Sequence, residues 1–79
     1  MLCFIGYKEY CEYHKEDEVR YYTSNPLYAV RSENFCDSRS LADIFTSVDE
    51  AKDSAKDIKT DKQLMIFDIY GKIVGSDLP

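Results

Sequence analysis

The sequence contains no tryptophan, only three glycines and two prolines, and no long hydrophobic run. The glycines are isolated at positions 6, 71 and 75, so no glycine-rich phosphate loop precedes a helix and nucleotide binding is disfavoured. The opening apolar stretch, residues 1–5, is shorter than the core of a signal peptide, and no other stretch approaches the ~20 residues of a membrane span. The sequence therefore predicts a cytoplasmic protein without a membrane span.

An excess of basic residues is also lacking, since 15 Asp and Glu stand against 10 Lys and Arg and give a net charge of −5. This balance disfavours a general binder of phosphate backbones. A chain of 79 residues has room for a single domain, residues 1–79, and at this size only about 60% of the unfolded surface becomes buried. A deep active-site cavity is not expected, whereas 44% hydrophobic residues argue against disorder.

The three cysteines, Cys3, Cys11 and Cys36, are odd in number and widely spaced, which predicts reduced thiols. Cys11 and His14 have C-x-x-H spacing, and the other two cysteines could complete a zinc site. On an alternating strand, however, positions 11 and 14 point to opposite faces unless a turn intervenes. A nucleophilic Cys/His pair also lacks a third, orienting residue. We therefore predict no metal, no cofactor and no enzyme, with a metal site or small enzyme built on Cys11 and His14 as the third hypothesis.

Period-two alternation from Cys3 onward predicts a long first strand with one apolar face. The elements expected after it are a turn at 15–17, a strand over 19–23, a break at 24–26, a strand over 27–31, and a loop over 32–40 in which Phe35 and Cys36 point inward.

A helix start is marked by Ser47 and Glu50, which have the spacing of a capping box. A narrow apolar stripe then follows at helical spacing: Val48, Ala51, Ala55 and Ile58. Two further apolar stretches, 64–67 and 72–74, are separated by turn residues and predict a closing hairpin. The predicted fold is α+β, an antiparallel sheet of 4–6 strands with one helix, about residues 48–60, packed on one face. One helix covers only part of such a sheet, so the other face is expected to meet solvent, a partner or a second copy in a homodimer.

Tyrosine is concentrated at the N-terminal end, where six of the seven tyrosines fall within the first 28 residues. Because tyrosine is amphipathic and common in interfaces, this skew favours a non-enzymatic module that binds another protein. The predicted contact residues are Tyr10, Tyr21 and Tyr22, with Glu16, Asp17 and Glu18 as rim charges. The alternative is a nucleic-acid-binding module in which the same tyrosines stack on bases beside Arg20 and Arg31. Without a basic stripe, cross-strand packing of the tyrosines is favoured over base stacking.

The C-terminal two thirds carry four short patterns: Tyr28-x-Val30-Arg31, then Phe45-x-Ser47-x-x-Glu50-Ala51-x-x-x-Ala55, then Leu64-x-Ile66 and Gly71-Lys72-Ile73. Over residues 28–74 the chain resembles small β-β-α-β-β domains of unknown function from bacteria and phages and, more distantly, some small anti-CRISPR proteins. It departs from them at Tyr28, where they have tryptophan, and at Tyr70, where they have Asp or Asn. The resemblance implies a non-enzymatic protein encoded by a phage or a mobile element. Together with the acidic charge and the tyrosine-rich surface, this predicts a small phage or viral inhibitor that blocks a host protein in the host cytoplasm.

Overall fold

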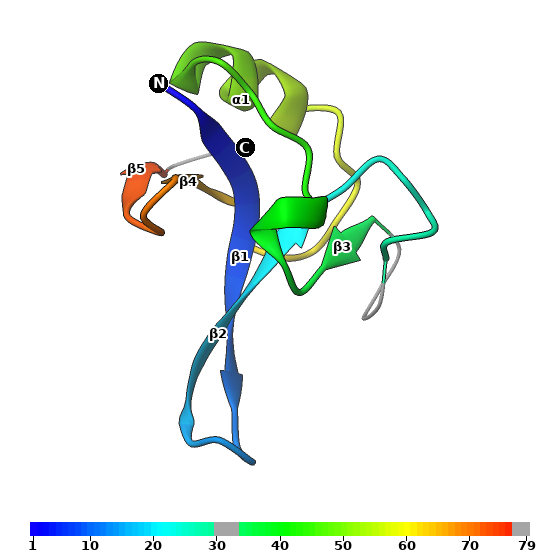
Figure 1. Cartoon of the computed structure of the whole chain (residues 1–79), viewed down its shortest axis with the longest axis vertical. Coiled ribbons are helices and arrows are strands. Elements are labelled where there is room, and N and C mark those ends of the chain that lie inside the picture. Colours follow the sequence, from blue (N-terminus) through cyan, green and yellow to red (C-terminus); the bar gives the residue numbers. More distant parts are fainter. Residues whose placement is uncertain (30–33, 77–79) are drawn as a thin grey trace.

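The computed structural model describes residues 1–29 and 34–76. These residues form one antiparallel five-stranded sheet with a single α-helix, which confirms the predicted α+β class (Figure 1). The strand order is β3-β2-β1-β4-β5. The elements are β1 (Cys3–Cys11), β2 (Glu16–Tyr22), β3 (Phe35–Cys36), the 3₁₀ turn η1 (Arg39–Leu41), α1 (Val48–Ala55), β4 (Met65–Asp68) and β5 (Ile73–Gly75).

The central strand β1 divides into two halves. Its first five residues are buried, because β4 pairs with it from Cys3 to Gly6 and β2 begins to pair with it at Gly6. Its second half pairs with β2 as far as Cys11 and is mostly exposed. As a result the β1–β2 hairpin extends away from the body of the domain (Figure 1).

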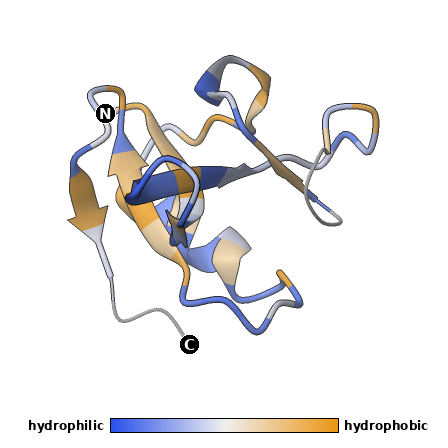
Figure 2. Cartoon of the chain, turned by 90° about the horizontal axis from the view of Figure 1, so that it is seen from below, coloured by the Kyte–Doolittle hydropathy of each residue, from blue (hydrophilic) through white to orange (hydrophobic). Residues whose placement is uncertain are grey.

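The main core lies between the sheet and α1. The helix places its two small buried residues, Ala51 and Ala55, on the sheet, so the helix and the sheet can approach closely. These two residues are the middle of the predicted apolar stripe, which is confirmed there. The sheet and the connecting segments supply the larger members of this core: Cys3, Ile5, Tyr7, Phe35, Phe45, Leu64 and Ile66. Figure 2 shows the hydrophobic colour on the strands of the body and the hydrophilic colour on the hairpin and on several connecting loops.

The helix begins where the sequence predicts but ends earlier than residue 60. The Ser47 hydroxyl accepts a hydrogen bond from the Glu50 amide at 3.1 Å, as a capping box requires. The Glu50 carboxylate, however, accepts from the amide and the hydroxyl of Thr46 instead of from Ser47. After Ala55 the amides of Asp57 and Ile58 bond to carbonyls three residues back, so the last turn tightens and α1 ends.

The sheet face away from the helix was expected to meet solvent, a partner or a second copy. In the body of the domain this is wrong, because the chain itself covers that face. A second cluster fills that face: Phe4, Tyr21, Cys36, Ala42 and Phe67. The segment that contains η1 crosses it, since Ala42 packs into the cluster and the Arg39 guanidinium donates to the Ile69 carbonyl. The Tyr21 ring packs edge-to-face on Phe4 and Phe67, with ring centroids 6.1 and 6.0 Å apart.

The third strand lies later in the chain than the predicted strand over 27–31. Asn25 accepts a hydrogen bond from the Leu27 amide on its side chain and another from the Tyr28 amide on its carbonyl, so the chain turns there. Residues 30 and 31 lie outside the described residues. β3 is instead formed by Phe35 and Cys36, which pair with Tyr22 and Tyr21 and are buried as predicted.

In the parts of the chain that the structure describes, no helix has the length and apolar character needed to cross a membrane.

Candidate functional site on the β1–β2 hairpin

The turn of the β1–β2 hairpin occupies residues 12–15, earlier than the predicted turn at 15–17. Lys15 completes the turn in the left-handed region, with φ at 55°. Glu16 and Asp17 therefore belong to β2, which is longer at its start than the predicted strand over 19–23.

This turn is the exception that the sequence-based prediction allowed, and it brings Cys11 and His14 to the same side of the hairpin. The Cys11 Sγ atom lies 3.5 Å from His14 Nδ1. Glu18 joins them from β2, with its Oε1 atom 2.6 Å from the same His14 nitrogen. One sulfur, one nitrogen and one carboxylate oxygen thus lie within 4.8 Å of one another. We call Cys11, His14 and Glu18 the hairpin triad.

The second oxygen of Glu18 is held by Arg20. Arg20 Nη2 lies 2.6 Å from Glu18 Oε2, and its side chain is only 6% exposed. Arg20 Nε lies 3.0 Å from Asp37 Oδ1, an ion pair in which this nitrogen lacks hydrogen-bond geometry. The hydrogen bonds that Glu18 accepts from Arg20, and next from His14, lower its pKa to about 2. Glu18 is therefore ionised at neutral pH and fixed in orientation.

The contacts of His14 decide between two kinds of chemistry. In a nucleophilic triad, the nucleophile and the carboxylate contact opposite nitrogens of the imidazole ring. Here Cys11 and Glu18 both approach Nδ1, so the Cys11 thiol has no imidazole relay to a carboxylate. Three donors that converge on one point have the arrangement of metal ligands, and a thiolate, an imidazole and a carboxylate are all ligands of zinc.

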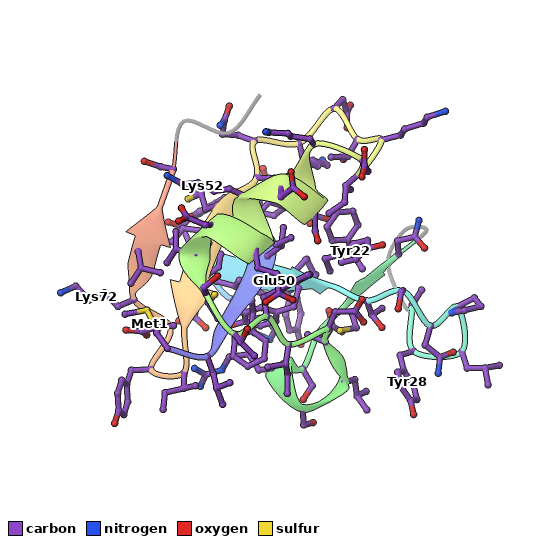
Figure 3. All side chains as sticks on the ribbon, turned by 90° about the horizontal axis from the view of Figure 1, so that it is seen from above. Met1, Tyr22, Tyr28, Glu50, Lys52 and Lys72 are labelled. Atoms are coloured by element: carbon purple, nitrogen blue, oxygen red, sulfur yellow. The ribbon has the colours of Figure 1, made fainter. Side chains whose placement is uncertain are left out.

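The three tyrosines predicted as contact residues have different surroundings. Tyr10 is 59% exposed and lies on the hairpin opposite Asp17. Tyr21 is buried in the second core cluster, so it does not contribute to a contact surface, and burial raises its pKa. Tyr22 is half-buried on the opposite side of the sheet, near α1 (Figure 3). The cause is the alternation of β2, which sends adjacent tyrosines to opposite faces.

Among the predicted rim charges, Glu16 and Asp17 are exposed, whereas Glu18 is held by Arg20 and His14. Sequence reasoning missed Tyr13, which stands at the hairpin turn and is 89% exposed. Its ring meets the His14 ring edge-on, with centroids 5.0 Å apart. The signal that could have found Tyr13 is its position between Cys11 and His14 in the C-x-x-H spacing. The turn that exposes it was expected to begin three residues later.

A pocket of about 230 Å³ lies beside Tyr22. It is lined by Tyr22, Asp43, Phe45, Ser54, Asp57 and Ile58. Small-molecule sites usually measure about 300–1,000 Å³ and are mostly apolar, so this pocket does not match a typical ligand site. A broader and shallower depression runs beside the hairpin, past His14, Glu18, Arg20 and Asp37.

The nucleic-acid alternative loses two of its expected contacts in the described residues. The Arg20 guanidinium is held between Glu18 and Asp37, and Tyr21 is buried in the cluster that covers the second face of the sheet. Arg31 lies outside the described residues.

Comparisons of the chain with protein-family models, curated proteins and solved structures found no match. The resemblance to small phage domains therefore stays a prediction.

Proposed function

We propose that the protein is a non-enzymatic module that binds another protein through its β1–β2 hairpin. The observation that carries this proposal is the exposure of aromatic side chains on an element that extends from the body. Tyr10 and Tyr13 are 59% and 89% exposed, whereas Tyr7 on the same strand is 3% exposed. Exposed tyrosine favours an interface, because the ring contributes a large apolar area and its hydroxyl a hydrogen bond.

The charges of the hairpin suggest the chemistry of the partner. Five carboxylates and two lysines fall within residues 8–18. Glu9, Glu12, Glu16 and Asp17 are exposed among them, and Glu9 lies 3.7 Å from the ammonium group of Lys62. An acidic rim around aromatic residues fits a basic protein surface, and it would act mainly by raising the association rate. Occupying such a surface would exclude its other ligands, which is how a domain of this size would inhibit a host protein.

The test uses two tyrosines of matched exposure. Tyr13 on the hairpin is 89% exposed, and Tyr70 in the β4–β5 turn is 85% exposed. A photo-crosslinking phenylalanine analogue is placed at one position or the other in the full chain, in the cell from which the gene comes. We expect a protein that crosslinks from position 13 and not from position 70.

That protein is then purified and its affinity is measured against variants. Tyr10→Ala or Tyr13→Ala should weaken binding by more than about tenfold, the scale of an interface hot spot. Tyr70→Ala should stay within about twofold, as expected for a residue outside the interface. Equal crosslinking from both positions would refute the proposal. So would an affinity that does not change when Tyr10 or Tyr13 is replaced by alanine.

A further inference from the structure

The hairpin triad offers an ordered set of metal donors at an exposed position. Its sulfur comes from the end of β1, its imidazole from the turn and its carboxylate from β2. We infer that Cys11, His14 and Glu18 bind one Zn²⁺ ion through Sγ, Nδ1 and Oε1, with a fourth position open to water. This inference does not depend on the proposed function.

The sulfur–nitrogen distance already fits a tetrahedral zinc site, whereas the nitrogen–oxygen distance must lengthen. With ordinary zinc–ligand bonds at tetrahedral angles, a sulfur ligand lies about 3.6 Å from an imidazole nitrogen ligand. The same nitrogen lies about 3.3 Å from a carboxylate oxygen ligand. The Cys11 Sγ to His14 Nδ1 distance of 3.5 Å already matches. The His14 Nδ1 to Glu18 Oε1 distance of 2.6 Å is that of a hydrogen bond. It must open by roughly 0.7 Å when the metal replaces the proton between the two atoms.

The ligand types select the class of ion. Ca²⁺ and Mg²⁺ prefer oxygen ligands alone, whereas a thiolate and an imidazole together suit zinc and its neighbours among the transition metals. Binding is balanced by proton movements. The Cys11 thiol releases its proton to solvent. The proton that His14 Nδ1 donates to Glu18 leaves that nitrogen, and the metal-bound imidazole keeps a proton on Nε2, so Nδ1 can bind the metal.

Arg20 acts as a positioning residue for this site. Its Nη2 atom holds Glu18 Oε2 at 2.6 Å and leaves the other oxygen directed at His14. Because Arg20 is buried and also paired with Asp37, the carboxylate is oriented before any metal arrives. Outer contacts of this kind commonly change metal affinity by about 10–100-fold. The body of the domain thereby orients one ligand of a site that lies on the hairpin.

The experiment is a calorimetric titration of the reduced full-length protein with Zn²⁺ alone, in a buffer without a chelating thiol. We expect one equivalent to bind and about one proton to be released per zinc. Cys11→Ser and His14→Gln each remove one of three protein ligands, so each should weaken binding by more than about 100-fold, above the range for outer contacts. Both side chains lie outside the two core clusters, so these variants should fold, which circular dichroism checks.

Asp17→Asn is the matched control. It removes a carboxylate next to Glu18 but on the other face of the hairpin, opposite Tyr10. Its zinc affinity should stay within about threefold of the wild type, which is far less than the loss of a ligand.

Cobalt supplies a second measurement, because a thiolate ligand gives Co²⁺ a sulfur-to-metal charge-transfer absorption. This band should appear in the wild type and disappear in Cys11→Ser. The inference is overturned if zinc binds the wild type no more tightly than His14→Gln. It is also overturned if the cobalt band persists without Cys11, since Cys3 or Cys36 would then be the ligand.

Discussion

The two halves of β1 have the same alternating sequence but opposite surroundings. In the first half, Tyr7 is 3% exposed and packs on Phe35, with ring centroids 4.9 Å apart. In the second half, Tyr10 is 59% exposed. The difference arises because β4 pairs with β1 only from Cys3 to Gly6, whereas β2 pairs with it as far as Cys11. A periodic pattern thus predicts a strand, but neighbouring strands decide which part of it becomes core.

The largest expected effect compares the loss of stability when a side chain is removed from the body with the loss when one is removed from the hairpin. Phe67 is fully buried in the second cluster, so Phe67→Ala should lower the free energy of unfolding by about 3–5 kcal/mol. Tyr13→Ala, on the hairpin, should change it by less than about 0.5 kcal/mol. Urea denaturation of both variants measures the contrast, with Phe67→Leu as a milder change if Phe67→Ala does not fold. Similar losses for Phe67→Ala and Tyr13→Ala would show that the hairpin is packed like the body.

The second prediction concerns the junction between the two halves. At Gly6, a Cβ atom would lie 2.4 Å from the Arg20 carbonyl oxygen. That atom is backbone and cannot swing away, so Gly6→Ala should cost about 1–3 kcal/mol. Lys8→Ala, two residues further along β1 and exposed, is the control and should be nearly neutral. Thermal unfolding of the two variants would contradict the close approach if both had the wild-type midpoint.

The third prediction tests the edge of the body, where α1 begins. Ser47→Ala removes the acceptor for the Glu50 amide and should cost about 1 kcal/mol, as other N-cap losses do. Lys52→Ala replaces an exposed residue within α1 by a better helix former and should not destabilise the protein. Urea midpoints compare the two, and an unchanged midpoint for Ser47→Ala would argue against the cap.

The smallest expected effect is on the hairpin and depends on pH. Folding lowers the pKa of Glu18 from 4.5 to about 2, so its ionised form stabilises the native state above pH 4.5. This contribution is lost as the pH falls from 4.5 towards 2, when Glu18 becomes protonated in the native state. Glu18→Gln should therefore be less stable than the wild type at neutral pH, and the difference should close across that acidic range. Thermal melts at a series of pH values, without added metal, test this. A difference that does not vary with pH would show that the Arg20 contact is not electrostatic.

The fold class and the start of α1 were predictable because they depend on local chemistry. Ser47 and Glu50 mark the cap by spacing alone, and Ala51 and Ala55 mark the buried side of the helix. The end of α1 was not predictable, since no glycine marks it and the chain passes through a tighter turn to Ile58. The third strand was missed for a different reason. Phe35 and Cys36 are two residues, too few to show a period, and their partners Tyr22 and Tyr21 fix them.

The sequence singled out Cys11 and His14 as a candidate pair, but one misplaced turn hid their geometry. Charged residues at 15–17 drew the prediction of the turn, but the chain turns at 12–15 with Lys15 at a positive φ. No glycine or asparagine marks that position, although these are the residues that most readily adopt it. With the turn misplaced, Cys11 and His14 were expected on opposite faces, and Glu18 was assigned to a rim. Cross-strand neighbours such as Arg20 and Asp37 depend on strand pairing, which no local pattern reveals.

The pairing of β1 with β4 joins nearly opposite ends of the chain, since Cys3 lies opposite Asp68. During synthesis β2 emerges soon after β1, so this hairpin can close early, whereas contacts between distant residues form slowly. Phe45 bridges Cys3 on the same edge of β1 as β2, so the other edge has to wait for β4. The nascent chain would therefore present the hairpin, with Tyr10 and Tyr13, before the domain beneath it is complete.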